Sequence, residues 1–277
     1  MSPSQIGLFG SQVRYWTSGP AAARSIVMVH GFRGNHIALL SIAEGLAGFR
    51  VIVPDLPGFG ESTPMTDLPH DVDGYVAFVK AFIAELRLDR PVLLGESFGS
   101  VVASRVAVSE PDLVSELILV NPIAVSPRAI NLPLCALMEG YYWLVANLPE
   151  PLAERVLASK TVNRLESLAL LTARDRPTRG EVYRRRLYNL GFPQDRRVIA
   201  ESFPDSIGLT AADEAERITH RTLLVAGEKD ALSPASYQRR LHDRISRSTL
   251  VLVPRTGHFM PLETPSDVAA AIVEFLG

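Results

Sequence analysis

The sequence predicts an α/β fold, a doubly wound and mostly parallel sheet with a helical insertion near its middle. Short, continuous apolar runs alternate with stretches of helical periodicity over the first 125 residues. Such runs are typical of parallel strands that are covered on both faces. Between about residues 126 and 212 no strand-like run of convincing length appears. We therefore expect residues 1–125 and 207–277 to form one α/β core and residues 126–206 to form a helical cap or lid.

Strands and helices alternate along the two core segments. Short runs at residues 6–9 and 13–17 predict a hairpin, and further strands are expected at residues 25–30, 51–54, 92–94, 116–120, 222–226 and 248–253. Helices are expected at about residues 37–46, 71–86, 101–108 and 234–243, and within the insertion near residues 134–146, 152–157, 165–172, 179–189 and 196–203. The last helix begins where Thr264 can cap it and Pro265 suits its first turn.

Composition and charge exclude several classes of function. The chain has 277 residues, of which 47% are hydrophobic, and a net charge of -2 that gives no reason to expect binding to nucleic acid. The longest apolar stretch, residues 132–148, is interrupted by Glu139 and is shorter than the roughly 20 residues of a membrane span. The single cysteine, Cys135, excludes an internal disulfide and a cysteine-based zinc site. With no signal-peptide pattern at the N-terminus, we expect a cytoplasmic protein that acts on a small molecule as a monomer or homodimer.

The segment Gly95-Glu96-Ser97-Phe98-Gly99 stands between a predicted strand and a predicted helix. The two glycines lack a Cβ atom, so strand and helix can approach closely while Ser97 is held in a tight turn with its hydroxyl exposed. The pattern Gly-x-Ser-x-Gly alone has little specificity. Its position between a strand and a helix makes Ser97 a candidate nucleophile.

Two further candidates, Asp230 and His258, follow the last two predicted strands. A serine hydroxyl needs a base to take its proton, and a carboxylate fixes the tautomer of a histidine base. In an open α/β sheet the carboxyl ends of the strands share one edge, so Ser97, Asp230 and His258 are expected to converge there. Glu228, two residues before Asp230, is a rival acid. Asn121 ends another strand, but its amide cannot act as the acid.

Five motifs occur in order, each at the expected end of a strand. They are His30-Gly31-Phe32, Asp-x-x-Gly-x-Gly-x-Ser at residues 55–62, Gly-Glu-Ser-Phe-Gly around Ser97, Gly-x-x-Asp ending at Asp230, and Gly-His-Phe around His258. With this set the chain resembles the α/β-hydrolase fold superfamily, as a serine esterase-like member with an inserted helical cap. The resemblance covers the core and hardly reaches the insertion.

The resemblance implies a catalytic triad of Ser97, Asp230 and His258, with no metal and no cofactor. It also implies an oxyanion hole formed by the backbone N–H groups of Phe32 and Phe98. The expected function is hydrolysis of a carboxylic ester with a small to medium, largely apolar substrate. One alternative is hydrolysis of a carbon–carbon bond in a β-diketone or dienoate, and another is a small-molecule receptor without turnover. An aspartate nucleophile would suggest haloalkane dehalogenase or epoxide hydrolase chemistry, and Ser97 argues against both.

The substrate pocket is the least specified part of the prediction. Its candidate residues are His30, Met138, Tyr141, Tyr142, Trp143 and Phe259. The aromatic residues of the insertion could equally pack the cap onto the core, and His30 is expected to hold the oxyanion loop more than to touch substrate. The run Arg184-Arg185-Arg186 favours a solvated helix face over an anion site.

Overall fold

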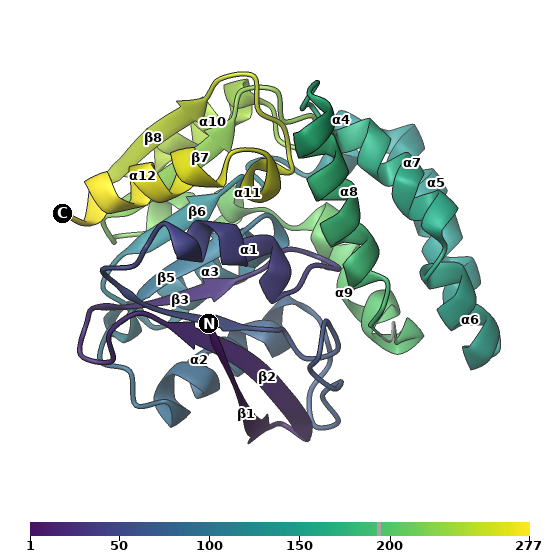
Figure 1. Cartoon of the computed structure of the whole chain (residues 1–277), viewed down its shortest axis with the longest axis horizontal. Helices are drawn as coiled ribbons and strands as arrows, with labels where there is room; N and C mark the ends of the chain where they lie inside the picture. The colour runs from purple at the N-terminus through teal and green to yellow at the C-terminus, as the bar shows by residue number, and fades with distance from the viewer. Residues whose placement is uncertain (193–194) are drawn as a thin grey trace.

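The computed structural model describes residues 1–192 and 195–277, except for the side chains of residues 165–169. Its eight-stranded sheet has the order β1-β2-β4-β3-β5-β6-β7-β8 (Figure 1). The strands are β1 (Ser2–Leu8), β2 (Ser11–Ser18), β3 (Ser25–Val29), β4 (Arg50–Pro54), β5 (Val92–Glu96), β6 (Leu117–Val120), β7 (Thr222–Gly227) and β8 (Ser248–Val253). β2 pairs antiparallel with β1 and β4, and the remaining pairs are parallel. The predicted doubly wound, mostly parallel sheet is confirmed.

Strand β3 illustrates why the central strands contain continuous apolar runs, here Ile26 to Val29. Ile26 and Met28 belong to one buried cluster, whereas Val27 and Val29 belong to the other, because side chains alternate between the two faces of a sheet. Helices α1 (His36–Glu44) and α12 (Pro265–Leu276) cover the first face. Helices α2 (Val72–Glu85), α3 (Phe98–Ser109) and α10 (Ala235–Arg244) cover the second.

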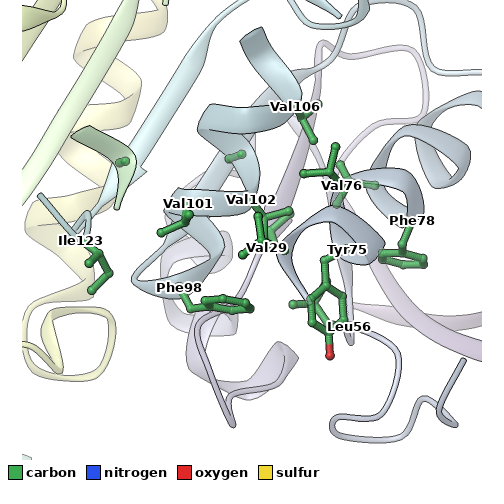
Figure 2. Packing of buried hydrophobic residues seen from close by; sticks show 14 of the residues in the cluster. Val29, Leu56, Tyr75, Val76, Phe78, Phe98, Val101, Val102, Val106 and Ile123 are labelled. Atoms are coloured by element: carbon green, nitrogen blue, oxygen red, sulfur yellow. The ribbon is translucent and has the colours of Figure 1, made fainter. Parts of the chain in front are cut away.

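The start of α3 is fixed by aromatic packing against α2 (Figure 2). The rings of Tyr75 and Phe98 meet edge to face, with their centroids 6.0 Å apart. The Tyr75 hydroxyl donates a hydrogen bond of 3.1 Å to the carbonyl of Pro57, so its burial leaves no polar group unpaired. Phe98 directly follows Ser97, and its fully buried ring therefore anchors the turn that presents the serine.

Within the described residues, the insertion between β6 and β7 consists of helices and connecting loops and contains no strand. Its helices are α4 (Pro127–Ile130), α5 (Leu132–Ala146), α6 (Glu150–Leu157), α7 (Lys160–Leu170), α8 (Arg176–Asn189) and α9 (Arg196–Gly208). Figure 1 shows α5, α6 and α7 on the side away from the sheet, with α8 and α9 nearer to it. The helix expected at residues 165–172 begins earlier, at Lys160, and the expected boundary at residue 206 falls inside α9.

Helix α9 is joined to the core at the loop before α2. Glu201 accepts hydrogen bonds from the backbone N–H of His70, at 2.8 Å, and from its ring Nδ1, at 2.7 Å. One helical turn further on, Asp205 accepts the backbone N–H of Val72 at 2.9 Å. Val72 is the first residue of α2, so Asp205 satisfies one of the N–H groups that a helix N-terminus leaves unpaired.

The predicted cap of the last helix is wrong in its side-chain detail. Thr264 is the N-cap residue of α12, but its side chain makes no capping hydrogen bond. Its Oγ1 atom is buried and has no hydrogen-bond partner among the described residues. The short helix α11 (Met260–Glu263) ends directly before Thr264, and the N–H of Thr264 bonds to the carbonyl of Met260. The chain thus enters α12 from a helix.

Candidate active site

Ser97 lies in the turn between β5 and α3, with a backbone φ of 51° and ψ of -119°. This positive φ is rare for a residue with a side chain and stores strain. The glycines on both sides explain how the turn fits. A Cβ atom on Gly95 would lie 2.2 Å from the carbonyl oxygen of Gly99, and one on Gly99 would lie 2.3 Å from that of Val29. Neither position has room for a side chain.

The three residues predicted to converge are brought together at the carboxyl ends of β5, β7 and β8. Ser97 Oγ is 2.9 Å from Nε2 of His258, and Nδ1 of His258 is 2.8 Å from Oδ2 of Asp230. Asp230 is buried, and its other oxygen, Oδ1, accepts the N–H groups of Leu232 at 2.8 Å and Ser233 at 3.2 Å. Asp230 therefore has a fixed orientation, and this arrangement can pass the serine proton to His258.

The charges around His258 favour its protonated form. Burial is the largest single influence and lowers the pKa of His258, but the charge and hydrogen bond of Asp230 and the charge of Glu96 raise that pKa above the ordinary histidine value. The guanidinium of Arg186 acts in the opposite direction. The imidazolium that forms when a serine loses its proton would be stabilised at this position.

Asn121, at the end of β6, holds the loop of His258 against the end of β7. Its Nδ2 donates to the carbonyl oxygens of Gly257, at 3.0 Å, and His258, at 2.9 Å. Its Oδ1 accepts the N–H of Gly227 at 2.8 Å. From the sequence, Asn121 stood out only as a position where an acid could lie, and this function was not predicted. Its place at a strand end was the available signal, but the partners lie more than 100 residues away.

The loop after β3 and the start of α3 contain the two backbone N–H groups that are expected in the oxyanion hole, those of Phe32 and Phe98. Gly31 packs against the elbow, because a Cβ atom at Gly31 would lie 3.0 Å from the Cβ of Ser97. Within the described residues, no protein acceptor pairs with the backbone N–H of Phe32 or with that of Phe98. Two unpaired N–H groups beside a serine are what an oxyanion site requires.

A pocket of about 670 Å³ opens above Ser97, and its lining is mainly apolar and aromatic. From the core it is lined by Phe32, Arg33, Ser97, Phe98, Ile123, Leu232, His258 and Phe259, and from the insertion chiefly by Leu134, Cys135, Leu137, Met138, Tyr141, Tyr142, Val162, Leu170, Arg186, Asn189, Leu190 and Phe203. The candidates Met138, Tyr141, Tyr142 and Phe259 are therefore at the pocket. A volume of this size suits a small organic molecule.

Two candidates, His30 and Trp143, lie outside the pocket. His30 is fully buried, its Nε2 accepts the N–H of Leu56 at 2.9 Å, and its Nδ1 is 2.8 Å from the carbonyl of Gly31. A carbonyl only accepts, so Nδ1 has the proton and the ring is neutral, consistent with burial lowering its pKa. Trp143 is 68% exposed, because it is one residue past Tyr142 on α5 and so faces another side of that helix.

The three arginines of α8 differ in their surroundings. Arg184 is exposed and pairs with Glu181, whereas Arg185 donates to Ser41 Oγ on α1 at 2.6 Å. Arg186 lines the pocket, with its guanidinium 4.5 Å from the ring centroid of Phe259. The expectation of a solvated face is wrong for Arg186, since successive residues of a helix point about 100° apart.

The described residues include no group of three or more His, Cys, Asp or Glu side chains that could hold a metal ion. Over the same residues, no helix has both the length and the apolar character that crossing a membrane would require.

A family model for the alpha/beta hydrolase fold matches residues 24–265. The chain belongs to the α/β-hydrolase fold family. It is 27% identical to the 2-hydroxymuconate semialdehyde hydrolase of Pseudomonas sp. (strain CF600), over 91% of this chain and 86% of that protein. It is also 27% identical to haloalkane dehalogenase 2 of Mycobacterium tuberculosis (strain H37Rv), over 83% of this chain and 79% of that protein.

Among solved structures, a hydrolase from Pseudomonas aeruginosa PA01 superposes with a TM-score of 0.81. The two proteins share 21% sequence identity, and the match covers 99% of this chain and 98% of the Pseudomonas aeruginosa protein. At this identity the likeness shows the fold alone. The match to the family model makes this chain an α/β hydrolase. The names of the two sequence relatives describe different reactions, so they do not agree on the bond that is cleaved.

Proposed function

We propose that this α/β hydrolase cleaves carboxylic esters with a small to medium, largely apolar substrate, through an acyl-enzyme on Ser97. One observation supports this most directly. The hydrogen-bonded chain from Ser97 Oγ through His258 to Asp230 lies at the base of an apolar pocket, with links of 2.9 and 2.8 Å. Activated serine, oriented base and apolar binding space are the parts that ester hydrolysis needs.

In the first step, Ser97 Oγ attacks the ester carbonyl carbon while its proton moves to Nε2 of His258. The carbonyl oxygen takes up the electron pair, and the N–H groups of Phe32 and Phe98 stabilise its negative charge. The carbon–oxygen bond to the alcohol then breaks, and the imidazolium donates its proton to the departing oxygen. Asp230 keeps Nδ1 protonated throughout, so that Nε2 faces the serine.

In the second step, water replaces the alcohol. His258 takes a proton from the water, the hydroxide oxygen attacks the acyl carbon, and the bond to Ser97 Oγ breaks as the serine recovers its proton. The products are the carboxylic acid and free enzyme, and these steps require no oxidant, metal or organic cofactor.

Replacement of the nucleophile tests this proposal. Ser97→Ala should reduce kcat for a p-nitrophenyl ester by a factor on the order of 10⁴ or more, because no other group can form the acyl-enzyme. The matched control is Ser109→Ala, at the exposed far end of α3, which should retain wild-type turnover. Wild-type turnover by Ser97→Ala would contradict the proposal.

Hydrolysis of a carbon–carbon bond in a dienoate is the second candidate, and Arg186 favours it. A dienoate has a carboxylate group, which a guanidinium binds well, and Arg186 lines the pocket near His258. The relative from Pseudomonas sp. (strain CF600) is by name a semialdehyde hydrolase. Comparing kcat/KM for an aryl ester with kcat/KM for a ring-cleavage dienoate separates the two candidates.

A receptor without turnover is the third candidate. A fluorophosphonate reacts with an activated serine, so covalent labelling of the wild-type protein and not of Ser97→Ala would argue against this candidate. Binding of a small molecule with no labelling and no ester turnover would favour it.

A further inference from the structure

Glu96 is the last residue of β5 and directly precedes the proposed nucleophile. Its side chain is only 9% exposed, which is unusual for a carboxyl group. Oε2 of Glu96 accepts the backbone N–H of Gly31 at 2.8 Å. One buried carboxyl group therefore links the strand that holds Ser97 to the loop that follows β3.

The contact between Glu96 and Gly31 leaves no space for a side chain at position 31. A Cβ atom built on Gly31 would lie 2.7 Å from Oε2 of Glu96 and 3.0 Å from the Cβ of Ser97. Glu96 therefore fixes the His30–Gly31 peptide. The next peptide, Gly31–Phe32, contains the Phe32 N–H that is expected in the oxyanion hole. A shift of this loop would move that N–H relative to Ser97.

Glu96 also influences the proposed base. Burial is the main cause that raises the pKa of Glu96, and the charge of His258 and the Gly31 N–H oppose it. In return, the charge of Glu96 raises the pKa of His258, in addition to the larger effect of Asp230. Among the residues that the structure describes, the charged groups acting on His258 are the carboxylates of Asp230 and Glu96 and the guanidinium of Arg186.

We propose that Glu96 is a positioning residue that acts on both the oxyanion hole and the proposed base. Its oxygen holds the Gly31 N–H and so places the Phe32 donor above Ser97. Its carboxyl group adjoins Ser97, whose Oγ is 2.9 Å from Nε2 of His258, so its negative charge stabilises the imidazolium that His258 becomes while the tetrahedral intermediate exists. This proposal rests on the proposed function, since it assumes that Ser97 is the nucleophile and His258 the base.

Two substitutions separate the hydrogen bond from the charge. Glu96→Gln keeps an oxygen that can accept the Gly31 N–H but removes the charge. We expect kcat to fall about tenfold with little change in KM, and the acid limb of kcat/KM to move to lower pH, because a lower pKa lets His258 remain a neutral base in more acidic solution. Glu96→Ala removes both contributions, and we expect kcat to fall on the order of 10²-fold, as for a misplaced oxyanion donor.

The matched control is Glu228→Gln, an exposed carboxyl group just beyond the end of β7 that accepts the N–H of Arg255. It should retain wild-type kcat and an unchanged pH profile. Thermal unfolding of each variant identifies any loss of fold, and the near-isosteric Glu96→Gln keeps the test informative if Glu96→Ala does not fold.

The proposal for Glu96 is overturned if Glu96→Gln has wild-type kcat and an unmoved acid limb while Ser97→Ala is inactive. Activity of Ser97→Ala would instead overturn the proposed function, and with it the function assigned to Glu96. The two failures are therefore distinguishable in one set of measurements. A shifted acid limb in Glu96→Gln, with Glu228→Gln unchanged, supports the proposal, because loss of packing alone would not move that limb in this direction.

Discussion

Asn121 shows how much of the candidate site depends on single side chains outside the proposed triad. Its amide donates to two backbone carbonyls in the His258 loop and accepts one N–H at the end of β7. Its backbone φ of 43° is in the left-handed region, where asparagine is tolerated better than most residues. Only an amide offers donors and an acceptor on one planar group of this size.

The substitution Asn121→Asp tests this arrangement with almost no change in shape. A carboxylate would face the carbonyls of Gly257 and His258 without a proton to donate, so we expect stability to fall by about 1–3 kcal/mol. Displacement of the His258 loop should lower kcat about tenfold or more, since small displacements of catalytic groups are costly.

Thermal unfolding and ester turnover measure the two effects of Asn121→Asp. Asn147→Asp is the control, because Asn147 is exposed at the end of α5. Equal stability and equal kcat in the two variants would contradict the function given to Asn121.

At the scale of elements, the junction between α9 and α2 depends on two carboxylates of α9. Glu201 and Asp205 lie one turn apart and accept N–H groups from the start of α2 and from His70. Burial tends to raise the pKa of Glu201, but its hydrogen bonds with Arg197 and His70 hold that pKa below the usual carboxyl value. Stabilisation by the charged form of Glu201 is therefore present above the ordinary carboxyl pKa and is lost as the pH falls through the lowered value.

Replacing Glu201 by glutamine should weaken this junction at neutral pH and not at low pH. We expect Glu201→Gln to lower Tm by about 2–4 °C at pH 7, which corresponds to a loss on the order of 1 kcal/mol. At low pH, once the pH has fallen through the lowered pKa of Glu201 and the wild-type charge is lost, the difference between the two proteins should shrink. Thermal unfolding at both pH values checks this, with Glu154→Gln on the exposed surface of α6 as control. A Tm difference that does not change with pH would exclude charge as the cause.

At the scale of the whole molecule, the insertion contacts the loop that holds the proposed base. Thr172 donates its N–H to Oε1 of Glu263, at 3.1 Å, and its hydroxyl to Oε2, at 2.5 Å. A Cβ atom on Gly257, the residue before His258, would lie 2.6 Å from Cγ2 of Thr172. The segment between α7 and α8 thus packs directly on the loop of His258, so insertion and base are coupled in position.

A double substitution tests this coupling. Gly257→Ala should lower kcat about tenfold, because the new methyl group must displace either Thr172 or the His258 loop. Adding Thr172→Ser removes the methyl group closest to the new Cβ atom while keeping the hydroxyl that binds Glu263, so we expect part of the lost turnover to return. Measuring kcat for ester hydrolysis in the two single variants and the double variant gives the coupling free energy between positions 257 and 172. Strictly additive effects would contradict it.

The order of strands and helices could be predicted from the sequence because it depends on local patterns. Apolar runs such as residues 25–29 and the helical period at residues 72–85 reflect which side chains face the core. The meeting of Ser97, Asp230 and His258 at one sheet edge could be predicted because each of them follows the carboxyl end of a predicted parallel strand. The side chains of the insertion could not be assigned in this way, since Tyr142 and Trp143 are adjacent in sequence but face different sides of α5.

The sequence by itself determined the fold family, the order of the elements and the three residues that meet at the end of the sheet. Each of these depends on local periodicity, on glycine positions or on the rule that parallel strands end at a common edge. Only the tertiary structure decided that Asn121 joins the His258 loop to the end of β7, that Arg186 faces the pocket and that Glu96 reaches Gly31. These contacts join segments far apart in the chain, and a contact of that kind depends on how helices and loops pack in three dimensions, which local sequence does not encode.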